Sequence, residues 1–279
     1  MKFLLPLFLF LAIGCQMKPT KVVNQEAIQS ESITAENLKK ENAVLLDARP
    51  AFEFNLLHVP GAINVRWEDL SQNNPKSRGL LQTDLFALAR RLSLIGIDPN
   101  TKVVVLGKGT AGQGEEGRVA WTLKVLGVKN VYTLVHNSYR EMNPTKEIPP
   151  VQNKPYWKPE VQEGLMTELK SLQALAAKAD LNTVILDVRS PEEFAQRNLS
   201  QEKKVKAKVV NLDWKKFFTS NGLPQKDVEK TLAALGISKD INIVVISNHG
   251  VRSGAVTYAL GFLGYNKSSN FAGGYEQWK

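Results

Sequence analysis

The sequence predicts an α/β protein of two similar domains, each built on a parallel sheet with helices on both faces. The chain has 279 residues, which exceeds the usual size of a single domain. Short runs of β-branched apolar residues alternate with stretches of helical periodicity, and this alternation is typical of parallel sheets that are buried on both faces. The alternation also occurs twice along the chain, which indicates two domains of one kind.

The second half of the chain repeats the first at a nearly constant offset. Three pairs of segments lie 140 residues apart, namely 44–54 and 184–194, 92–97 and 232–237, and 103–107 and 243–247. Between these pairs, Trp67 corresponds to Trp214 at an offset of 147, so the second copy gains seven residues and then loses them again. We therefore expect a duplicated domain, with the first copy at 33–146, an extended, proline-rich linker at 147–165 and the second copy at 166–279.

The N-terminus predicts a signal peptide and a lipid anchor. Residues 1–14 carry one early positive charge and then an apolar run of roughly ten residues, which is too short to span a bilayer. Residues 12–15 resemble the lipobox of bacterial lipoproteins, in which the cysteine is lipidated, and Cys15 is the only cysteine of the chain. We expect residues 15–32 to form a lipidated tether that holds the protein on a membrane outside the cytoplasm, in the periplasm or at the cell surface. Ordinary secretory cleavage, with Cys15 incidental, is the alternative.

The segment 243–254 contains the strongest candidate site. Four β-branched residues predict a buried strand, a short polar loop follows, and a helix with one inward apolar face is expected from about Val251. A loop that leads from a strand into a helix directs backbone N–H groups and the positive end of the helix dipole at one point, so it can hold an anion or activate a nucleophile. The residues of this candidate anion-binding loop are Ser247, Asn248, His249, Gly250, Val251, Arg252 and Ser253.

Composition and spacing argue against several kinds of site. The formal charge is +9, but the densest basic run, residues 203–208, lacks interleaved aromatic residues and any nucleic-acid motif, so no nucleic-acid partner is expected. Three scattered histidines and one cysteine give no metal-ligand spacing. Residues 107–112 match G-x-G-x-x-G, but no acidic residue ends the next strand, as a dinucleotide site requires. We interpret these glycines as a lengthened copy of the candidate loop, and we expect no metal and no cofactor.

Several other polar residues are expected to be structural. An aspartate and an arginine end the first strand of each copy, where they would tie down the adjoining loops; they are Asp47 with Arg49 and Asp187 with Arg189. His58 is expected to bond nearby backbone, and His136 has no evident partner. Glu115 and Glu116 begin a helix, where their charges suit the positive end of its dipole.

These motifs resemble the tandem rhodanese family of sulfurtransferases. The first copy carries Leu46–Arg49 and His58–Asn64, which are similar to the family's LDxR and GHIPGAIN segments. The second copy carries Leu186–Phe194 and ends in Phe271–Trp278, which is similar to the family's GGxxxW segment. The resemblance extends over roughly residues 33 to 279. It implies two rhodanese-like domains of the α/β class predicted above.

The active loop of this family reads C-x-x-G-x-R/T, and its cysteine carries a persulfide. Here the loop keeps Gly250 and Arg252 but has Ser247 in place of the cysteine, and Gly107 is the equivalent in the first copy. A thiolate can hold a sulfane sulfur, whereas a serine hydroxyl stays largely neutral and forms no persulfide. Glu193 also stands where the family tends to have a substrate-binding arginine, so we expect it to repel thiosulfate or mercaptopyruvate.

The resemblance and its departures together imply a catalytically inactive binding module. We expect the loop to recognise a small oxyanion or an acidic group of a partner protein. One alternative is a sulfurtransferase of the thiosulfate or 3-mercaptopyruvate type that works despite Ser247, although only the fold supports it. Another is a scaffold in which the basic residues 203–216 meet acidic lipid or protein. Ser247 is not expected to act as a serine nucleophile, because the sequence has no G-x-S-x-G elbow around it and shows no residue that would orient His249.

Overall fold

The computed structural model describes residues 34–139, 144–150 and 152–278. The predicted signal peptide and the tether with Cys15 lie outside these residues, so both remain predictions. Within the described ranges, no helix is long and apolar enough to cross a membrane.

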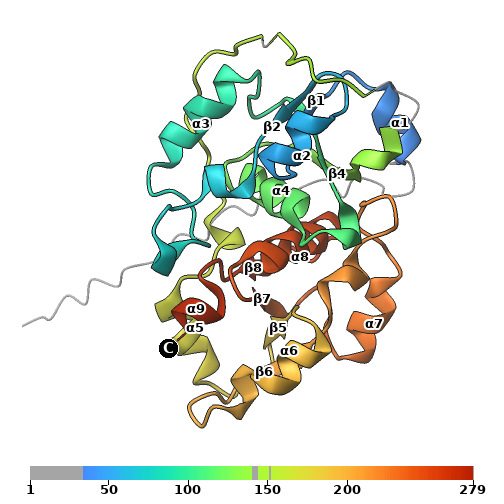
Figure 1. Cartoon of the computed structure of the whole chain (residues 1–279). Coiled ribbons are helices and arrows are strands. Elements are labelled where there is room, and N and C mark those ends of the chain that lie inside the picture. Colours follow the sequence, from blue (N-terminus) through green and yellow to red (C-terminus); the bar gives the residue numbers. More distant parts are fainter. Residues whose placement is uncertain (1–33, 140–143, 151, 279) are drawn as a thin grey trace, which may run out of the picture.

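Two four-stranded parallel sheets form the framework of the molecule (Figure 1). In the first sheet the strand order is β2-β1-β3-β4, and in the second it is β6-β5-β7-β8. The strands of the first are β1 (Val44–Asp47), β2 (Ala62–Asn64), β3 (Lys102–Gly107) and β4 (Asn130–Val135). The strands of the second are β5 (Thr183–Asp187), β6 (Lys208–Asn211), β7 (Asn242–Ile246) and β8 (Ser268–Asn270). The two orders are the same, so the duplication predicted from the repeat is confirmed in the topology.

Helices connect the strands. Those of the first domain are α1 (Ala35–Lys40), α2 (Ala51–Leu56), α3 (Leu85–Leu94) and α4 (Glu115–Val125). Those of the second are α5 (Leu169–Ala176), α6 (Pro191–Gln196), α7 (Val228–Ala234), α8 (Val251–Phe262) and α9 (Gly274–Gln277). Short 3-10 turns are η1 (Trp67–Leu70), η2 (Pro75–Ser77), η3 (Gly109–Ala111), η4 (His136–Tyr139), η5 (Glu163–Leu165), η6 (Leu199–Gln201) and η7 (Trp214–Phe217).

Both faces of each sheet are covered, as predicted. Side chains alternate between the two faces of a strand, so Val105 of β3 packs with α3 and α4 while Val104 packs with α1 and α2. In the second domain, Val245 of β7 packs with α7 and α8 while Val244 packs with α5 and α9. Residues 103–106 of β3 and 243–246 of β7 are therefore all apolar, because neither face meets water there.

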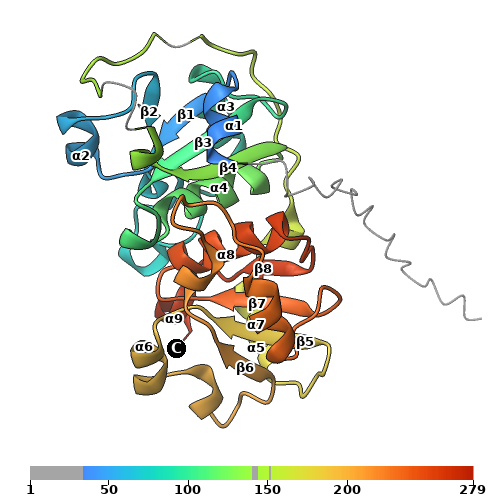
Figure 2. The ribbon, with the colours of Figure 1, turned by 90° about the vertical axis from the view of Figure 1, so that its right-hand side faces the viewer.

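The two domains meet through α4 and α8, which cross against each other between the sheets (Figure 2). Gly117 permits the close approach, because a Cβ there would lie 2.5 Å from the Cβ of Ala255. One apolar cluster includes residues of both helices and both sheets, so the core is continuous across the interface. The prediction of a single inward face for α8 is wrong: residues 253–260 are all buried, because a sheet lies on one side and α4 on the other.

The duplicated polar motifs make duplicated contacts. Arg49 Nη2 lies 2.7 Å from Asp47 Oδ2 and donates to the carbonyl of Leu57. In the second copy, Arg189 bonds Asp187 and the carbonyl of Arg197 in the same way. The expected structural role of both pairs is thus confirmed: each ties the end of a strand to the loop after the next helix.

Two histidines are satisfied by backbone carbonyls. The ring of His58 contacts the oxygens of Phe54 and Glu147, at 2.9 and 3.1 Å, which confirms a structural role. The sequence showed no evident partner for His136, and this interpretation is wrong. Its Nδ1 lies 2.9 Å from the carbonyl oxygen of Gly107. That contact joins the ends of neighbouring parallel strands, which sequence spacing does not reveal.

Candidate functional site

The candidate loop follows β7 and leads directly into α8. Val251 begins the helix, as predicted, and β7 ends at Ile246, the last of the four β-branched residues that predicted the strand. Gly250 adopts a φ of 73°, in the left-handed region, and a Cβ at this position would overlap the backbone of Ala272. A glycine is therefore required both by the turn and by the close packing of the loop on the C-terminal segment.

The hydroxyl of Ser247 is buried and already hydrogen-bonded. Ser247 is only 1% exposed, and its Oγ lies 3.0 Å from the Oγ of Ser253. The backbone N–H of Ser253 also donates to Ser247 Oγ, at 3.2 Å. The carbonyl of Ser247 accepts from the N–H of Tyr275, so the closing segment of the domain fixes this residue from behind. The first loop position is a structural anchor in this conformation.

Arg252 and Asn248 form a three-donor group, here called the fork, that holds the carboxylate of Glu193. Arg252 Nη1 and Nη2 donate to Glu193 Oε2 and Oε1, at 2.6 and 2.8 Å, and Asn248 Nδ2 donates to Oε1 at 2.7 Å. The hydrogen bonds from Arg252 lower the pKa of Glu193 to about 2, so the acid stays ionised. Sequence reasoning treated Glu193 only as a repulsive charge and missed this pairing.

His249 does have a carboxylate beside it, which corrects the sequence interpretation. Its Nδ1 lies 3.1 Å from Glu276 Oε2, but the approach lacks hydrogen-bond geometry, so it is an ionic contact only when the ring is protonated. Within the described part of the chain, no hydrogen bond joins His249 to Ser247. Ser247, His249 and Glu276 therefore do not form a hydrogen-bonded triad of nucleophile, base and acid.

The first domain covers the loop and contributes a buried cation. A Cβ on Gly79 would overlap the carbonyl oxygen of His249, so this segment lies directly on the loop. Arg118 of α4 is fully buried and donates to the carbonyls of Gly79 and Gly250, at 2.7 and 3.2 Å. Burial lowers the pKa of Arg118 to about 9, and no carboxylate among the described residues pairs with it. Sequence reasoning missed Arg118 altogether.

The equivalent loop of the first domain is filled by an acid of its own helix. Strand register places Gly107 where the second domain has Ser247, as predicted. A Cβ at Gly107 would overlap the carboxyl of Glu116, whose side chain thus lies over the loop. Burial raises the pKa of Glu116 to about 8. The expected favourable charge of Glu116 at the helix end is therefore wrong, since this buried acid is mostly neutral at pH 7.

The glycine-rich segment 107–112 leaves little room for a phosphate. The Glu116 carboxyl lies against Gly107, and Lys108 of the same segment is paired with Glu53 at 2.9 Å. This supports the interpretation of a lengthened loop copy over that of a dinucleotide site. No group of three His, Cys, Asp or Glu residues suited to a metal occurs in the described ranges.

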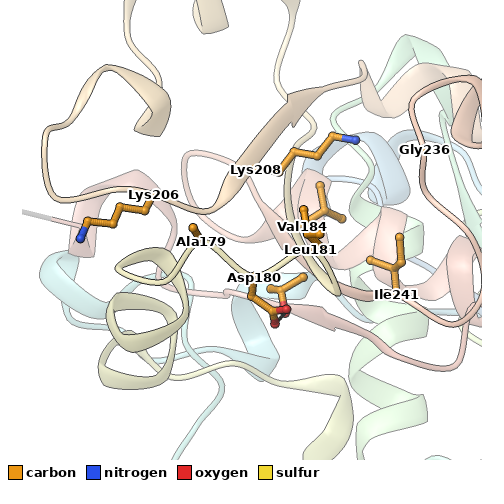
Figure 3. Close-up of a pocket in the computed structure, with 9 residues that line it drawn as sticks. Ala179, Asp180, Leu181, Val184, Lys206, Lys208, Gly236 and Ile241 are labelled. Atoms are coloured by element: carbon orange, nitrogen blue, oxygen red, sulfur yellow. Dashed lines mark hydrogen bonds between the residues drawn. The ribbon is translucent and has the colours of Figure 1, made fainter.

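A shallow cavity lies at the other edge of the second sheet (Figure 3). It measures about 260 Å³ and is lined at the amino ends of the strands by Asp180, Leu181, Lys206 and Lys208, among others. The candidate loop follows the carboxyl end of β7, so the two features lie at opposite edges of a parallel sheet. A second cavity, of about 290 Å³, lies beside Trp67 and Arg78 in the first domain.

Comparisons with known proteins agree with this architecture. The chain is 26% identical over 265 residues to a thiosulfate sulfurtransferase of Pseudomonas aeruginosa, covering 88% of this chain and 90% of that protein. The 3-mercaptopyruvate sulfotransferase SseA from Escherichia coli has a similar structure, with a TM-score of 0.69 and 19% identity over 86% of this chain and 95% of SseA. The anaerobic ergothioneine biosynthesis enzyme of Chlorobium limicola matches with a TM-score of 0.70 and 16% identity, over 88% and 67%.

The family assignment rests on both copies of the domain. Residues 31–142 and 169–279 each match the rhodanese-like domain, and these two matches include most of the chain. The two sheets with the same strand order are the structural counterpart of the two matches. The chain therefore belongs to the rhodanese-like family and carries two rhodanese-like domains in tandem.

Proposed function

We propose that this protein is a rhodanese-like binding module that does not transfer sulfur and that recognises an acidic group through residues 247–253. The main support comes from the residues of this loop. Ser247 stands at the position of the family's thiol, while Arg252 and Asn248 hold a carboxylate. The loop thus keeps donors for an anion but lacks the atom that would carry sulfur.

The chemistry at Ser247 supports the absence of sulfur transfer. A persulfide requires a sulfur nucleophile, and the only cysteine of the chain is Cys15. The hydroxyl of Ser247 bonds Ser253, and no base among the described residues lies within hydrogen-bond distance of it. This hydroxyl therefore stays neutral and largely shielded from solvent.

The surroundings of the fork support anion binding. Guanidinium and amide donors that meet two oxygens side by side are well suited to carboxylates and related oxyanions. The backbone N–H groups of residues 249–252 have no acceptor within the described part of the chain, and they lie at the start of the α8 helix. The positive end of the α8 dipole adds to their attraction for an anion.

The place of action in this proposal is the outer side of a bacterial membrane. The support is the leader of residues 1–14 and the position of Cys15 directly after it. Mass spectrometry of the mature N-terminus tests this part: a diacylglyceryl group on Cys15 supports the anchor, and an unmodified Cys15 contradicts it.

Ligand titration tests the binding proposal. Purified protein is titrated with sulfate, thiosulfate, phosphate and an acidic peptide, alongside Arg252→Gln. Arg197→Gln is a matched control, because the Arg197 side chain is 59% exposed and lies outside the loop. We expect at least one ligand to bind the unmodified protein and the control, and to lose at least tenfold in affinity with Arg252→Gln. Binding that is absent, or that does not depend on Arg252, contradicts the proposal.

The second candidate function is sulfur transfer itself. It is favoured by the similarity to the thiosulfate sulfurtransferase of Pseudomonas aeruginosa, which extends over nearly the whole of both chains. The family is shown by the rhodanese-like matches of both domains, while the residue at the nucleophile position of this chain differs from the family's cysteine. A direct assay of sulfur transfer separates the two candidates.

A further inference from the structure

The fork of Arg252 and Asn248 is already occupied by an acid from the same domain. Glu193 lies at the third position of α6, 59 residues before Arg252, and its two oxygens receive all three side-chain bonds of the fork. The backbone N–H of Ser190 also donates to Glu193 Oε2, so the acid is held in place by the helix start as well. An external anion would therefore compete with a well-placed internal one.

The same arrangement occurs in the first domain with different residues. Glu53 occupies the position in α2 that corresponds to Glu193, and it bonds Lys108 of the loop after β3 at 2.9 Å. The two loops differ in length and sequence, and their cations come from different loop positions. One glutamate position thus meets a loop cation in both copies, which argues that the pairing is a feature of this chain's domains rather than an accident of one loop.

The ligand that the fork holds in this structure is a planar carboxylate. Two guanidinium nitrogens face two oxygens of one carboxylate, in the bidentate arrangement that arginine makes with carboxylates and phosphates. The Glu193 side chain retains 31% of its exposure and that of Arg252 retains 15%, so the acid is the partner more open to solvent. Glu193 is therefore the side chain of this pair that an incoming carboxylate would meet first and displace.

We infer that residues 247–253 form a carboxylate site whose resident ligand is Glu193, and that an external acid binds there only by displacing this side chain. The inference rests on the proposed function and narrows it: the ligand is a carboxylate of a peptide or organic acid, the same group that Glu193 already presents to the fork. Glu193 is then the residue that sets the affinity of the loop for its partner.

Removal of the resident acid is the test. Acetate, formate and sulfate are titrated against the unmodified protein, Glu193→Ala and the double variant Glu193→Ala/Arg252→Gln by calorimetry and thermal shift at constant ionic strength. Glu192→Ala is the matched control, because Glu192 lies on the same helix but is exposed and outside the fork. Glu193→Gln is a second variant that keeps the side-chain oxygen for Ser190 if the alanine variant is poorly folded.

We expect Glu193→Ala to bind acetate or formate at least tenfold more tightly than the unmodified protein, and more tightly than sulfate. We expect this gain to be absent from Glu192→Ala and from the double variant. Equal acetate affinity for the unmodified protein and both Glu193 variants overturns the inference, and the proposed function survives if Arg252-dependent binding is still seen. If Glu193→Ala gains affinity for acetate or formate while the unmodified protein binds none of the ligands, the inference is supported. The proposed function of the loop in the unmodified protein is then overturned.

Discussion

Arg118 of the first domain donates a hydrogen bond, at 3.2 Å, to the carbonyl of Gly250 in the loop of the second domain. The same guanidinium donates to the carbonyl of Gly79, at 2.7 Å, and stacks over Trp121. One fully buried side chain therefore fixes the loop of one domain against the segment of the other that covers it. The shape of the candidate site depends on the interface as well as on its own domain.

Loss of this cation is expected to destabilise the protein. In Arg118→Met the volume is largely kept, but the carbonyl of Gly79 is left buried without its donor, which typically costs about 1–3 kcal/mol. Urea unfolding measures the change. Arg91→Met is the control and should lose less than about 0.5 kcal/mol, since Arg91 is exposed and its one side-chain hydrogen bond within the described ranges goes to the carbonyl of Asp69. An Arg118→Met protein as stable as the control would contradict this account of the interface.

Glu116 predicts a pH dependence of stability. Burial raises its pKa from 4.5 to about 8 in the folded protein, so the folded state keeps a proton that the unfolded state has released. Between these two values the free energy of unfolding falls as the pH rises, by at most about 1.4 kcal/mol per pH unit for one proton. Above pH 8 both states are ionised and the loss is complete.

Glu116→Gln should remove this contribution, so its free energy of unfolding should change less between pH 5 and 8 than that of the unmodified protein. Denaturant unfolding at a series of pH values measures the slopes. Glu115→Gln serves as the neighbouring control: it removes a charge that helps to raise the pKa of Glu116, so the fall should be retained but should end at a lower pH. Identical slopes for Glu116→Gln and the unmodified protein would show that the buried acid does not titrate in this range.

A comparison of alanine substitutions at Gly61 and Gly250 separates two losses in the free energy of unfolding, one from backbone strain and one from steric overlap. Gly61 and Gly250 both have a left-handed φ, of 81° and 73°, but a Cβ meets nothing within 4 Å at Gly61 and overlaps Ala272 at Gly250. Gly61→Ala should therefore cost about 1–2 kcal/mol from the conformation alone. We expect Gly250→Ala to cost clearly more, as measured by thermal or urea unfolding. Equal costs would mean that the loop moves away from Ala272 freely.

Much of the fold could be predicted from local pattern. The apolar runs at 103–107 and 243–247 indicated strands buried on both faces, and the repeat indicated two copies of one domain. The start of α8 at Val251 was predicted for the same reason: its loop and its apolar period adjoin in sequence. These features depend on neighbouring residues, so a single sequence contains them.

The contacts of the site could not be predicted in this way. Glu193 and Arg252 lie 59 residues apart and meet only because α6 and the loop after β7 lie at the same edge of the sheet. Arg118 is charged and stands in the first turns of a helix, a position that is usually exposed, and it is buried because α4 lies between the domains. Such pairings are set by tertiary packing, which leaves no local signal.

The central claim is that this protein does not transfer sulfur, and the most direct test is thiocyanate formation from thiosulfate and cyanide. The assayed chain begins at Gln16 and contains no cysteine, so any activity that it showed would come from something other than a thiol. We expect no activity above the rate without protein, with Ser247→Cys measured beside it to show whether the loop can still support a sulfur nucleophile. Thiocyanate formation by the unmodified protein would contradict the claim and would identify this chain as a working sulfurtransferase.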